Sequence, residues 1–455
     1  MEGRHHFSSR AGVILASVGS AVGLGNVWRF PMEAGRHGGA AFILVYLVFV
    51  LILALPVMCS EFVIGRAGKA NAADSFKHLM PGTRWPLVGY MGVLAGFLIF
   101  SFYVVVAAWT LFYTEECLRG ALLADRDFGL FFSDFSSSAW HPILFVAIFM
   151  AANTAIVAGG VQKGIERVSR WMMPLLFLII VLLAGFSMTL PGASAGLRFL
   201  LNPDFSRLTV DVVLSAMGQA FFSLSVGIGC LATYASYFKQ DVALMRSSLI
   251  ICLLDTMVAV ASGLVIFPVV FSIGAQVDAG PGLVFITLPH VFNAVWGATP
   301  VVNYLFSSLF YILLLVAALT SAISMHEMVT ALLHEKSRLT RPQAAVVVAL
   351  CAMVCATACS LSFGPWRNVT LLGMGFFDLF DFVTAKFMMP IGGLCFSVFA
   401  AWVMKRQFVE RELIGERPSR SAVWAMKVIC LLMRYIAPIC LVGVFFYELW
   451  SWSSK

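Results

Sequence analysis

Residues that could bind a cation together with a small solute lie in a glycine-rich interruption near the N terminus. The stretch GVILASVGSAVGLGNVWRFP (12–31) begins as an apolar helix, but it then contains Gly19, Ser20, Gly23, Gly25 and Asn26. Each glycine costs a helix about 1 kcal/mol relative to alanine. In a membrane, broken backbone is tolerated only where it is buried in protein or lines a polar cavity. The break therefore predicts free carbonyls for a cation and free N–H groups for an anion. A Gly19-x-x-x-Gly23 packing face between helices is the alternative interpretation.

Two further segments offer oxygen ligands of the same kind. The apolar run GQAFFSLSVGIGCLATYASY (218–237) is interrupted by Ser223, Ser225, Gly227 and Gly229. Thr320 and Ser321 are adjacent within another apolar run. Such hydroxyls most often bond to a carbonyl of their own helix. Beside two broken helices, however, they become candidate ligands for a hard cation such as Na⁺.

Composition limits the class of protein that can contain these residues. The chain has 455 residues, of which 60% are hydrophobic and 12% charged, and this excludes an ordinary soluble protein. The formal net charge of +7 fits basic cytoplasmic connectors and not nucleic-acid binding. The ten cysteines lie mostly in apolar runs without histidine or carboxylate at ligand spacing, so we expect packing and not a metal site. The sequence contains no motif typical of a catalytic nucleophile, a zinc site or a nucleotide-binding loop. We therefore do not expect this protein to be an enzyme.

Apolar runs of about 20 residues or more predict eleven membrane spans. Their approximate limits are 11–36, 39–65, 87–118, 141–159, 165–190, 210–238, 242–274, 300–334, 342–363, 376–404 and 422–450. Every connector on one side carries Lys or Arg, whereas the connector 119–140 on the other side carries three Asp residues. The positive-inside rule then places the N terminus in the cytoplasm. We expect a multi-pass protein of the cell (inner) membrane.

The two interrupted spans occupy corresponding positions in the chain. They open two sets of five spans, 8–190 and 209–406, which are followed by one extra span at 419–451. Because five is odd, the second set runs in the opposite direction, so the count predicts an inverted repeat. Paired interrupted spans indicate a transporter whose site lies between the breaks. We expect a single transmembrane domain, 1–455, with a short helical cap at 280–297 on the outer side.

Several of these segments together resemble one known family. GSAVGLGNVWRFP, the following GGAAF, GQAFFSLSVGIG with TYASY, and ALTSAIS resemble the neurotransmitter:sodium symporter family, in its short bacterial eleven-span branch. The resemblance implies the all-α leucine-transporter fold, with helices 1 and 6 unwound at the membrane midplane. It also implies Na⁺-coupled import of neutral, hydrophobic L-amino acids by alternating access. A substrate-sensing receptor or a channel on the same fold is the alternative.

The resemblance also names the partners that we expect. They are an amino acid, Na⁺ at two sites and membrane lipid, with no organic cofactor and no nucleic acid; a homodimer is left open. The first sodium site would use the carbonyl of Ala21 with Asn26, Ser223, Asp255 and the carboxylate of the substrate. The second would use the carbonyls of Gly19, Val22 and Ala317 and the hydroxyls of Thr320 and Ser321.

The same resemblance gives the substrate and gate residues. The set expected around the substrate is Ser20, Ala21, Gly23, Leu24, Gly25, Ile99, Tyr103, Phe222, Ser223, Ser225, Ile228, Ser321 and Met325. These side chains carry no fixed charge, so they favour a neutral substrate side chain. Arg29 with Asp381 would form the outer gate, and Arg4 with Glu335 the inner one.

Asp255 departs from the commonest pattern of the family, because many relatives carry asparagine there. Chloride-dependent members balance the sodium charge with an anion near positions equivalent to Tyr46, Gln219 and Ser223. An aspartate there supplies the negative charge covalently, so the resemblance implies chloride independence. Whether Asp255 carries a proton back after Na⁺ and substrate leave is left open.

Overall fold

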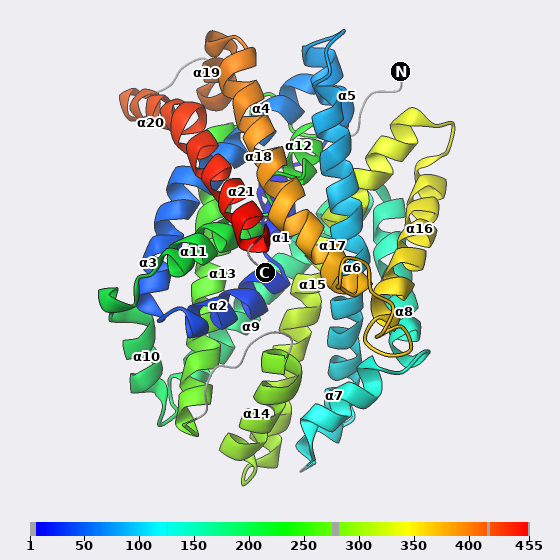
Figure 1. Cartoon of the computed structure of the whole chain (residues 1–455), viewed down its shortest axis with the longest axis vertical. Coiled ribbons are helices and arrows are strands. Elements are labelled where there is room, and N and C mark those ends of the chain that lie inside the picture. Colours follow the sequence, from blue (N-terminus) through cyan, green and yellow to red (C-terminus); the bar gives the residue numbers. More distant parts are fainter. Residues whose placement is uncertain (1–5, 125, 275–281, 416–418, 454–455) are drawn as a thin grey trace.

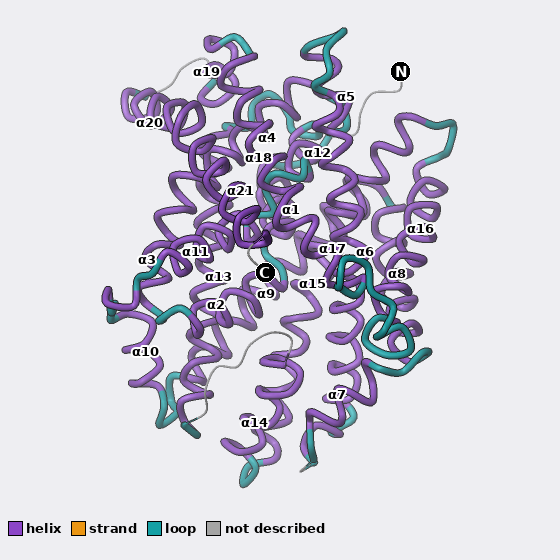
Figure 2. Tube along the Cα trace, viewed as in Figure 1, coloured by secondary structure: helices purple, strands orange, loops and turns teal. Residues whose placement is uncertain are grey.

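The computed structural model describes residues 6–124, 126–274, 282–415 and 419–453 of the chain. Every regular element within these ranges is helical (Figures 1 and 2). The α-helices are α1 (Arg10–Ala21), α2 (Phe30–Arg36), α3 (Ala40–Phe49), α4 (Leu55–Gly68), α5 (Ala72–Leu79), α6 (Pro86–Leu118), α7 (Phe128–Ser136), α8 (His141–Ala158), α9 (Arg167–Ser187), α10 (Ala193–Leu201), α11 (Val210–Ser223), α12 (Cys230–Ala235), α13 (Leu244–Ser272), α14 (Leu288–Trp296), α15 (Pro300–Lys336), α16 (Arg341–Leu361), α17 (Phe376–Val383), α18 (Met389–Val398), α19 (Arg406–Ile414), α20 (Arg420–Leu431) and α21 (Ala437–Ser453).

Several of these helices continue into one another through wide, π-type turns, which join α3 to α4, α17 to α18 and α20 to α21. Counted in this way, nine helices of the described ranges are long and apolar enough to cross a membrane. They are Ala40–Gly68, Pro86–Leu118, His141–Ala158, Val161–Ser187, Leu244–Ser272, Pro300–Lys336, Arg341–Leu361, Phe376–Val403 and Arg420–Tyr447. The pair α1 and α2 adds a tenth if it is taken as one bent span. The protein is therefore a multi-pass membrane protein.

The first predicted interruption is present as a bend. The helix α1 starts after Ser9, whose hydroxyl accepts a hydrogen bond from the Gly12 amide, and it ends at Ala21. After two non-helical residues, 22 and 23, the chain re-enters a helix through the π-type turn Gly25–Arg29. The two halves are bent by 53° relative to each other.

The second interruption separates α11 from α12 and leaves residues 224–229 outside both helices. Ser225, Gly227 and Gly229 have positive φ angles of 51°, 92° and 82°. Glycine adopts this backbone region readily, whereas a serine there is strained. Because the break divides the run 210–238, its longer half α11 has only 14 residues, too few for a continuous span. Figure 2 shows loop segments beside α12 and α1 in the interior of the bundle.

The breaks lie at the centre of the helix bundle. The two most buried spanning helices, α6 and α15, pack against each other, and α1 packs against α15, α9 and α13 (Figure 1). The helix α12 packs on α4, and α11 on α3. By contrast, Arg420–Tyr447 is the least buried span and lies at the periphery. The fold therefore surrounds both breaks with protein, as unpaired backbone in a membrane requires.

The expected cap at 280–297 is helical over Leu283–Trp296, whereas residues 280 and 281 lie outside the described ranges. Two buried tyrosine hydroxyls hold its first turn, because Tyr113 donates to the Phe285 carbonyl at 2.7 Å and Tyr311 to the Val284 carbonyl at 2.8 Å.

Candidate functional site

A small cavity lies between the two breaks. Its lining contains every residue expected around the substrate except Ser20, together with one residue that the sequence did not single out, Met389. Ser20 lies directly behind the lining, where its carbonyl accepts a hydrogen bond from the Ser225 hydroxyl at 3.5 Å. The structure thus brings together segments more than 200 residues apart in the sequence.

Close packing explains why the first break contains Gly23. A Cβ atom at this position would lie 2.4 Å from Ser321 Oγ and 3.0 Å from the Tyr103 hydroxyl oxygen. The first of these distances is shorter than any tolerated contact, so only glycine fits without movement of its neighbours. Gly25 is less restricted, since its added Cβ would meet the Phe222 ring at 3.2 Å.

One end of the cavity presents hydrogen-bond donors. The Leu24 amide donates to the Tyr103 hydroxyl at 3.3 Å, and the Gly23 amide donates to Asn26 Oδ1 at 3.0 Å. Both amides are free for these partners because α1 ends before them. Backbone N–H groups beside a tyrosine hydroxyl can hold a carboxylate. The rest of the lining is mainly apolar, with Ile99, Ile228 and Met325.

Oxygen atoms converge at the position expected for the second sodium ion. Ser321 Oγ donates to the carbonyl of Val22 at 2.9 Å and lies 3.5 Å from the carbonyl oxygen of Gly19. Thr320 Oγ1 lies 3.1 Å from the carbonyl oxygen of Ala317. All five predicted ligand residues are therefore within one cluster between α1 and α15. Neutral carbonyl and hydroxyl oxygens are the ligands that a hard cation takes.

The residues expected at the first sodium ion form a second cluster around Asp255. The side-chain amide of Asn26 donates to Asp255 Oδ1 at 2.8 Å and to Ser223 Oγ at 2.9 Å. Ser223 Oγ in turn donates to Asp255 Oδ2 at 2.7 Å. All three side chains are fully buried. Ala21 lines the adjoining cavity. Among the described residues no basic group pairs with Asp255, and a buried carboxylate held only by neutral donors is a strong site for a cation.

The surroundings of Asp255 also contain the residues named for an anion. The Tyr46 hydroxyl lies 3.4 Å from Ser223 Oγ, and the Gln219 amide donates to the Gly25 carbonyl at 3.0 Å. The carboxylate of Asp255 thus lies beside the residues that the resemblance implies for an anion.

A larger cavity of about 1,100 Å³ lies next to the first and shares Leu24, Gly25, Tyr103 and Phe222 with it. Arg29 and Asp381 both line this cavity, although no ion pair joins them among the described residues. The guanidinium of Arg29 instead lies 4.3 Å above the Phe222 ring, and its Nε atom is 4.0 Å from Glu33. The outer gate pair stays a prediction, and in this conformation its two members are separate.

Of the two residues expected at the inner gate, Glu335 is described, whereas Arg4 lies outside the described residues. Glu335 accepts hydrogen bonds from Asn71, from the backbone amide at 3.0 Å and from the side chain at 2.8 Å. Next to it, Lys336 pairs with Asp74 at 2.6 Å. Burial raises the pKa of Asp74, but the hydrogen bonds from Lys336 and Asn71 outweigh this effect and lower it below the ordinary value.

Glu61 is the principal site residue that the sequence reasoning missed. It is fully buried in α4, and its carboxylate accepts hydrogen bonds from the Gly227 amide at 2.6 Å and from the Ala232 amide at 3.3 Å. It therefore stabilises the backbone that the second break leaves unpaired. The available signal was a carboxylate inside an apolar span, which is costly unless it has a partner.

The sequence reasoning also missed a network of three side chains that joins helices near the expected cytoplasmic end of the bundle. The Tyr237 hydroxyl donates to Glu327 Oε1 at 2.7 Å, and Arg341 pairs with the other oxygen of Glu327. Glu327 is fully buried. This network joins the chain just after α12 to α15 and α16.

The candidate ligand groups of the site are oxygen atoms. Among the described residues, no group of three or more His, Cys, Asp or Glu side chains could hold a metal ion. The two oxygen clusters described above instead combine carbonyls, hydroxyls, an amide and one carboxylate. Such ligands suit an alkali cation better than a transition metal.

Comparisons with known proteins agree with this geometry. The model of the sodium:neurotransmitter symporter family matches residues 4–126 and 133–455. The uncharacterized sodium-dependent transporter YhdH of Bacillus subtilis (strain 168) is 38% identical over 443 residues, which are 96% of each chain. An uncharacterized sodium-dependent transporter of Haemophilus influenzae is 32% identical over 461 residues, 98% of each chain.

Among solved structures, the crystal structure of MhsT in complex with L-phenylalanine is similar, with a TM-score of 0.89 and 41% sequence identity. The alignment covers 98% of this chain and 100% of MhsT. The fold is therefore that of the leucine transporter, as the sequence predicted. With a family model matched over nearly its whole length, the chain belongs to the sodium:neurotransmitter symporter family, whose members are transporters and not enzymes.

Proposed function

We propose that this protein imports a neutral, hydrophobic L-amino acid together with Na⁺ by alternating access. The observation that carries the proposal is the cavity between the two breaks, which has hydrogen-bond donors at one end and apolar walls elsewhere. The amides of Gly23 and Leu24 and the Tyr103 hydroxyl would hold the substrate carboxylate. The apolar wall would hold an uncharged side chain.

The relatives support both parts of this proposal. YhdH bears the name of an uncharacterized sodium-dependent transporter, and MhsT has been crystallised with L-phenylalanine. Phenylalanine is a neutral amino acid with a large apolar side chain, of the kind that this cavity would accept.

Two sodium ions would bind at the oxygen clusters described above. At the first, the substrate carboxylate would join Ala21, Asn26, Ser223 and Asp255 as a ligand of the ion. The ion and the solute would then each lack a ligand without the other, and this couples their binding free energies. At the second, five neutral oxygens would hold the ion between α1 and α15, so that its binding favours one arrangement of these helices.

The architecture that fits this function has eleven spans, with α11 and α12 together forming the sixth. The spans of 8–190 and 209–406 would be the two inverted repeats, and the basic connectors would face the cytoplasm of the cell that carries the protein in its inner membrane. The network of Tyr237, Glu327 and Arg341 would hold the inner side closed while the larger cavity leads to the site.

A thermal-shift assay of the purified protein tests the proposal directly. L-phenylalanine should raise the melting temperature in NaCl but not in choline chloride, and L-glutamate should do so in neither. Equal shifts in both salts would contradict sodium coupling. Counterflow in proteoliposomes then distinguishes a transporter from a receptor on the same fold, since only a transporter exchanges labelled external substrate against unlabelled internal substrate.

A further inference from the structure

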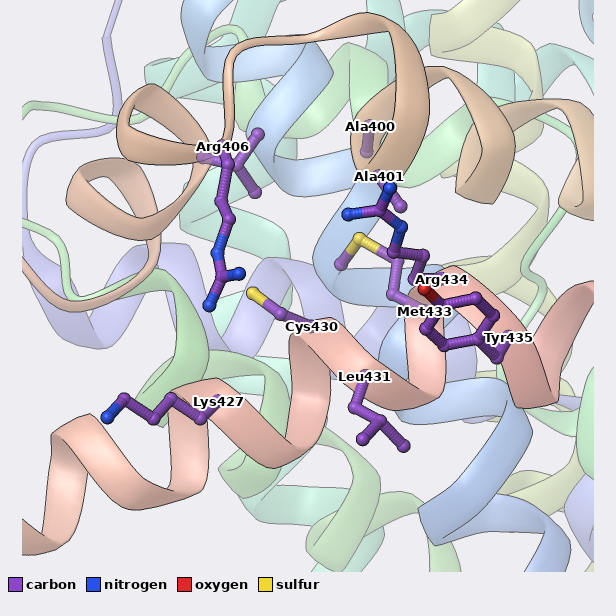
Figure 3. A pocket seen from close by; sticks show the side chains of 10 residues that line it. Ala400, Ala401, Arg406, Lys427, Cys430, Leu431, Met433, Arg434 and Tyr435 are labelled. Atoms are coloured by element: carbon purple, nitrogen blue, oxygen red, sulfur yellow. The ribbon is translucent and has the colours of Figure 1, made fainter.

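A basic cavity of about 810 Å³, remote from the transport site, lies between the end of the span Phe376–Val403, the start of α19 and the span Arg420–Tyr447. Three cationic side chains line it, Arg406, Lys427 and Arg434 (Figure 3). Figure 3 shows Arg406 reaching from its ribbon toward Cys430 and Lys427 on the facing helix. The remaining lining is almost entirely apolar: Ala400, Ala401, Val409, Cys430, Leu431, Met433 and Tyr435.

Arg434 is the residue that most requires a ligand. It lies 14 residues into the span Arg420–Tyr447, where a charge is costly unless it is paired. Among the described residues it forms no ion pair, and its Nε atom is buried without a hydrogen-bond partner. Its guanidinium lies 4.2 Å above the Trp402 ring and 5.6 Å from the Tyr435 ring. Aromatic stacking satisfies the faces of a guanidinium but not its N–H groups.

The charge balance of the cavity favours an anion. Arg406 pairs with Glu410 at 2.7 Å, and this is the only carboxylate bonded to any of the three cations within the described residues. Two positive charges therefore remain unbalanced. Lys427 and Arg434 are seven residues apart on one helix face, about 10 Å along the axis, so they can hold one elongated headgroup between them.

The position of the cavity favours a lipid over a soluble anion. Arg420–Tyr447 is the least buried of the spanning helices, and Leu431 and Tyr435 are exposed on it. The helices α19 and α20 meet at the same end of the bundle as α5, which carries Lys77 and is flanked by Lys69 and Arg84 (Figure 1). Trp402 and Tyr435 are residues of the kind that lie at a membrane–water interface. The cavity thus lies on a weakly buried side of the bundle, toward the end that carries these basic residues.

We infer that this basic cavity binds an anionic phospholipid from the leaflet at the α5 end of the bundle. Its anionic headgroup extends between Lys427 and Arg434 beside Arg406, and its acyl chains lie along Leu431 and Tyr435. Basic pockets between spanning helices on the cytoplasmic side are known to suit such headgroups. The lipid would fasten Arg420–Tyr447 to the preceding span, since the cavity joins the two.

Native mass spectrometry of the full-length protein tests this inference. Protein in a neutral detergent is titrated with dioleoyl-phosphatidylglycerol or dioleoyl-phosphatidylcholine, and the bound lipids are counted. One bound phosphatidylglycerol should remain on the protein under conditions in which phosphatidylcholine dissociates. The variant Lys427→Gln/Arg434→Gln should weaken that binding about tenfold. The control Arg84→Gln/Arg338→Gln removes the same charge from exposed connector positions and should leave it unchanged.

Several results would overturn the inference. Equal retention of phosphatidylcholine would mean that the apolar wall alone binds lipid, and an equal loss in the control variant would mean diffuse surface attraction. Displacement of phosphatidylglycerol by equimolar inorganic phosphate would show a site for a free anion. A dimer that dissociates in the double variant would show that a second copy faces the cavity. If the double variant does not fold, Lys427→Gln alone, an exposed substitution, and Arg434→Lys answer the same question.

Discussion

We expect uptake by this protein to be independent of chloride, and we expect the substitution Asp255→Asn to make it respond to chloride. The substitution keeps the shape of the side chain but removes the carboxylate charge that binds Asn26 and Ser223 at 2.8 and 2.7 Å. A unit charge about 4 Å from Na⁺ contributes about 4 kcal/mol at an effective dielectric constant of about 20. The side-chain amide of the substituted asparagine still supplies one ligand oxygen. We therefore expect the variant to lose half of this energy, about 2 kcal/mol, from the binding free energy of Na⁺. That corresponds to about a 30-fold rise in the half-saturating Na⁺ concentration.

In the Asp255→Asn variant, chloride should restore part of the lost Na⁺ affinity. The hydroxyls of Tyr46 and Ser223 lie 3.4 Å apart beside the substituted side chain, and both can donate to an anion. With its own carboxylate present, the wild-type protein has no charge left for chloride to neutralise.

Uptake of labelled substrate into proteoliposomes, with Na⁺ varied in chloride and in gluconate, measures both effects. Wild type should have the same half-saturating Na⁺ concentration in both salts. The variant should need a higher Na⁺ concentration in gluconate than in chloride. Asp204→Asn is the matched control, because this exposed carboxylate lies in a loop away from the site. If wild-type uptake collapses in gluconate, Asp255 does not replace the anion. If the variant keeps wild-type Na⁺ dependence, the carboxylate is not near the ion. An imposed inside-acid pH gradient tests proton return separately, since an unchanged rate would exclude it.

Further predictions concern single groups in the site. Tyr103→Phe should weaken substrate binding by about 1–3 kcal/mol, because a buried carboxylate loses one donor; isothermal titration in saturating Na⁺ checks this, and unchanged affinity would place Tyr103 elsewhere. Thr320→Ala and Ser321→Ala should each raise the Na⁺ concentration for half-maximal uptake, and wild-type dependence in both would show that the second sodium site is misplaced. Glu61→Gln should lower the melting temperature by removing charge-assisted hydrogen bonds to Gly227 and Ala232, each of which stabilises by about 1.5–3 kcal/mol. Glu61→Asp, which keeps the carboxylate, should lower it less, and equal losses would contradict a role for the charge.

Much of the site followed from the sequence because its chemistry is carried by backbone breaks. The glycine and serine interruptions at 19–26 and 223–229 can be recognised without contacts, and the resemblance then supplied the facing residues Tyr103, Thr320, Ser321 and Asp255. All of these lie at the two breaks in the structure. Met389 could not be found in this way, because a methionine in an apolar span carries no signal of its neighbours.

Partners across the bundle were harder to predict. The sequence paired Arg29 with Asp381, but Arg29 lies over Phe222 and near Glu33 one helical turn away. Both residues face one cavity, and their pairing as an outer gate stays a prediction. Glu61 and Glu327 show the opposite case, because each required a partner but sequence spacing could not identify Gly227, Ala232 or Arg341. Such pairs depend on tertiary packing, which a single sequence does not encode locally.

Hydrogen bonds among the ligand groups also explain why ion and solute should bind together. Ser321 donates to the Val22 carbonyl and the Gly23 amide donates to Asn26, so these groups that would bind a ligand already have protein partners. A ligand must replace those hydrogen bonds, and the net gain from replacing one is small. A cation that binds the side-chain oxygen of Asn26 leaves the Gly23 amide without its hydrogen-bond acceptor. The substrate carboxylate then supplies a new acceptor for this amide. The carboxylate in turn brings a negative charge that only the ion compensates. Each ligand therefore removes the cost that the other creates, and the broken helix that exposes these groups is the element that links the two.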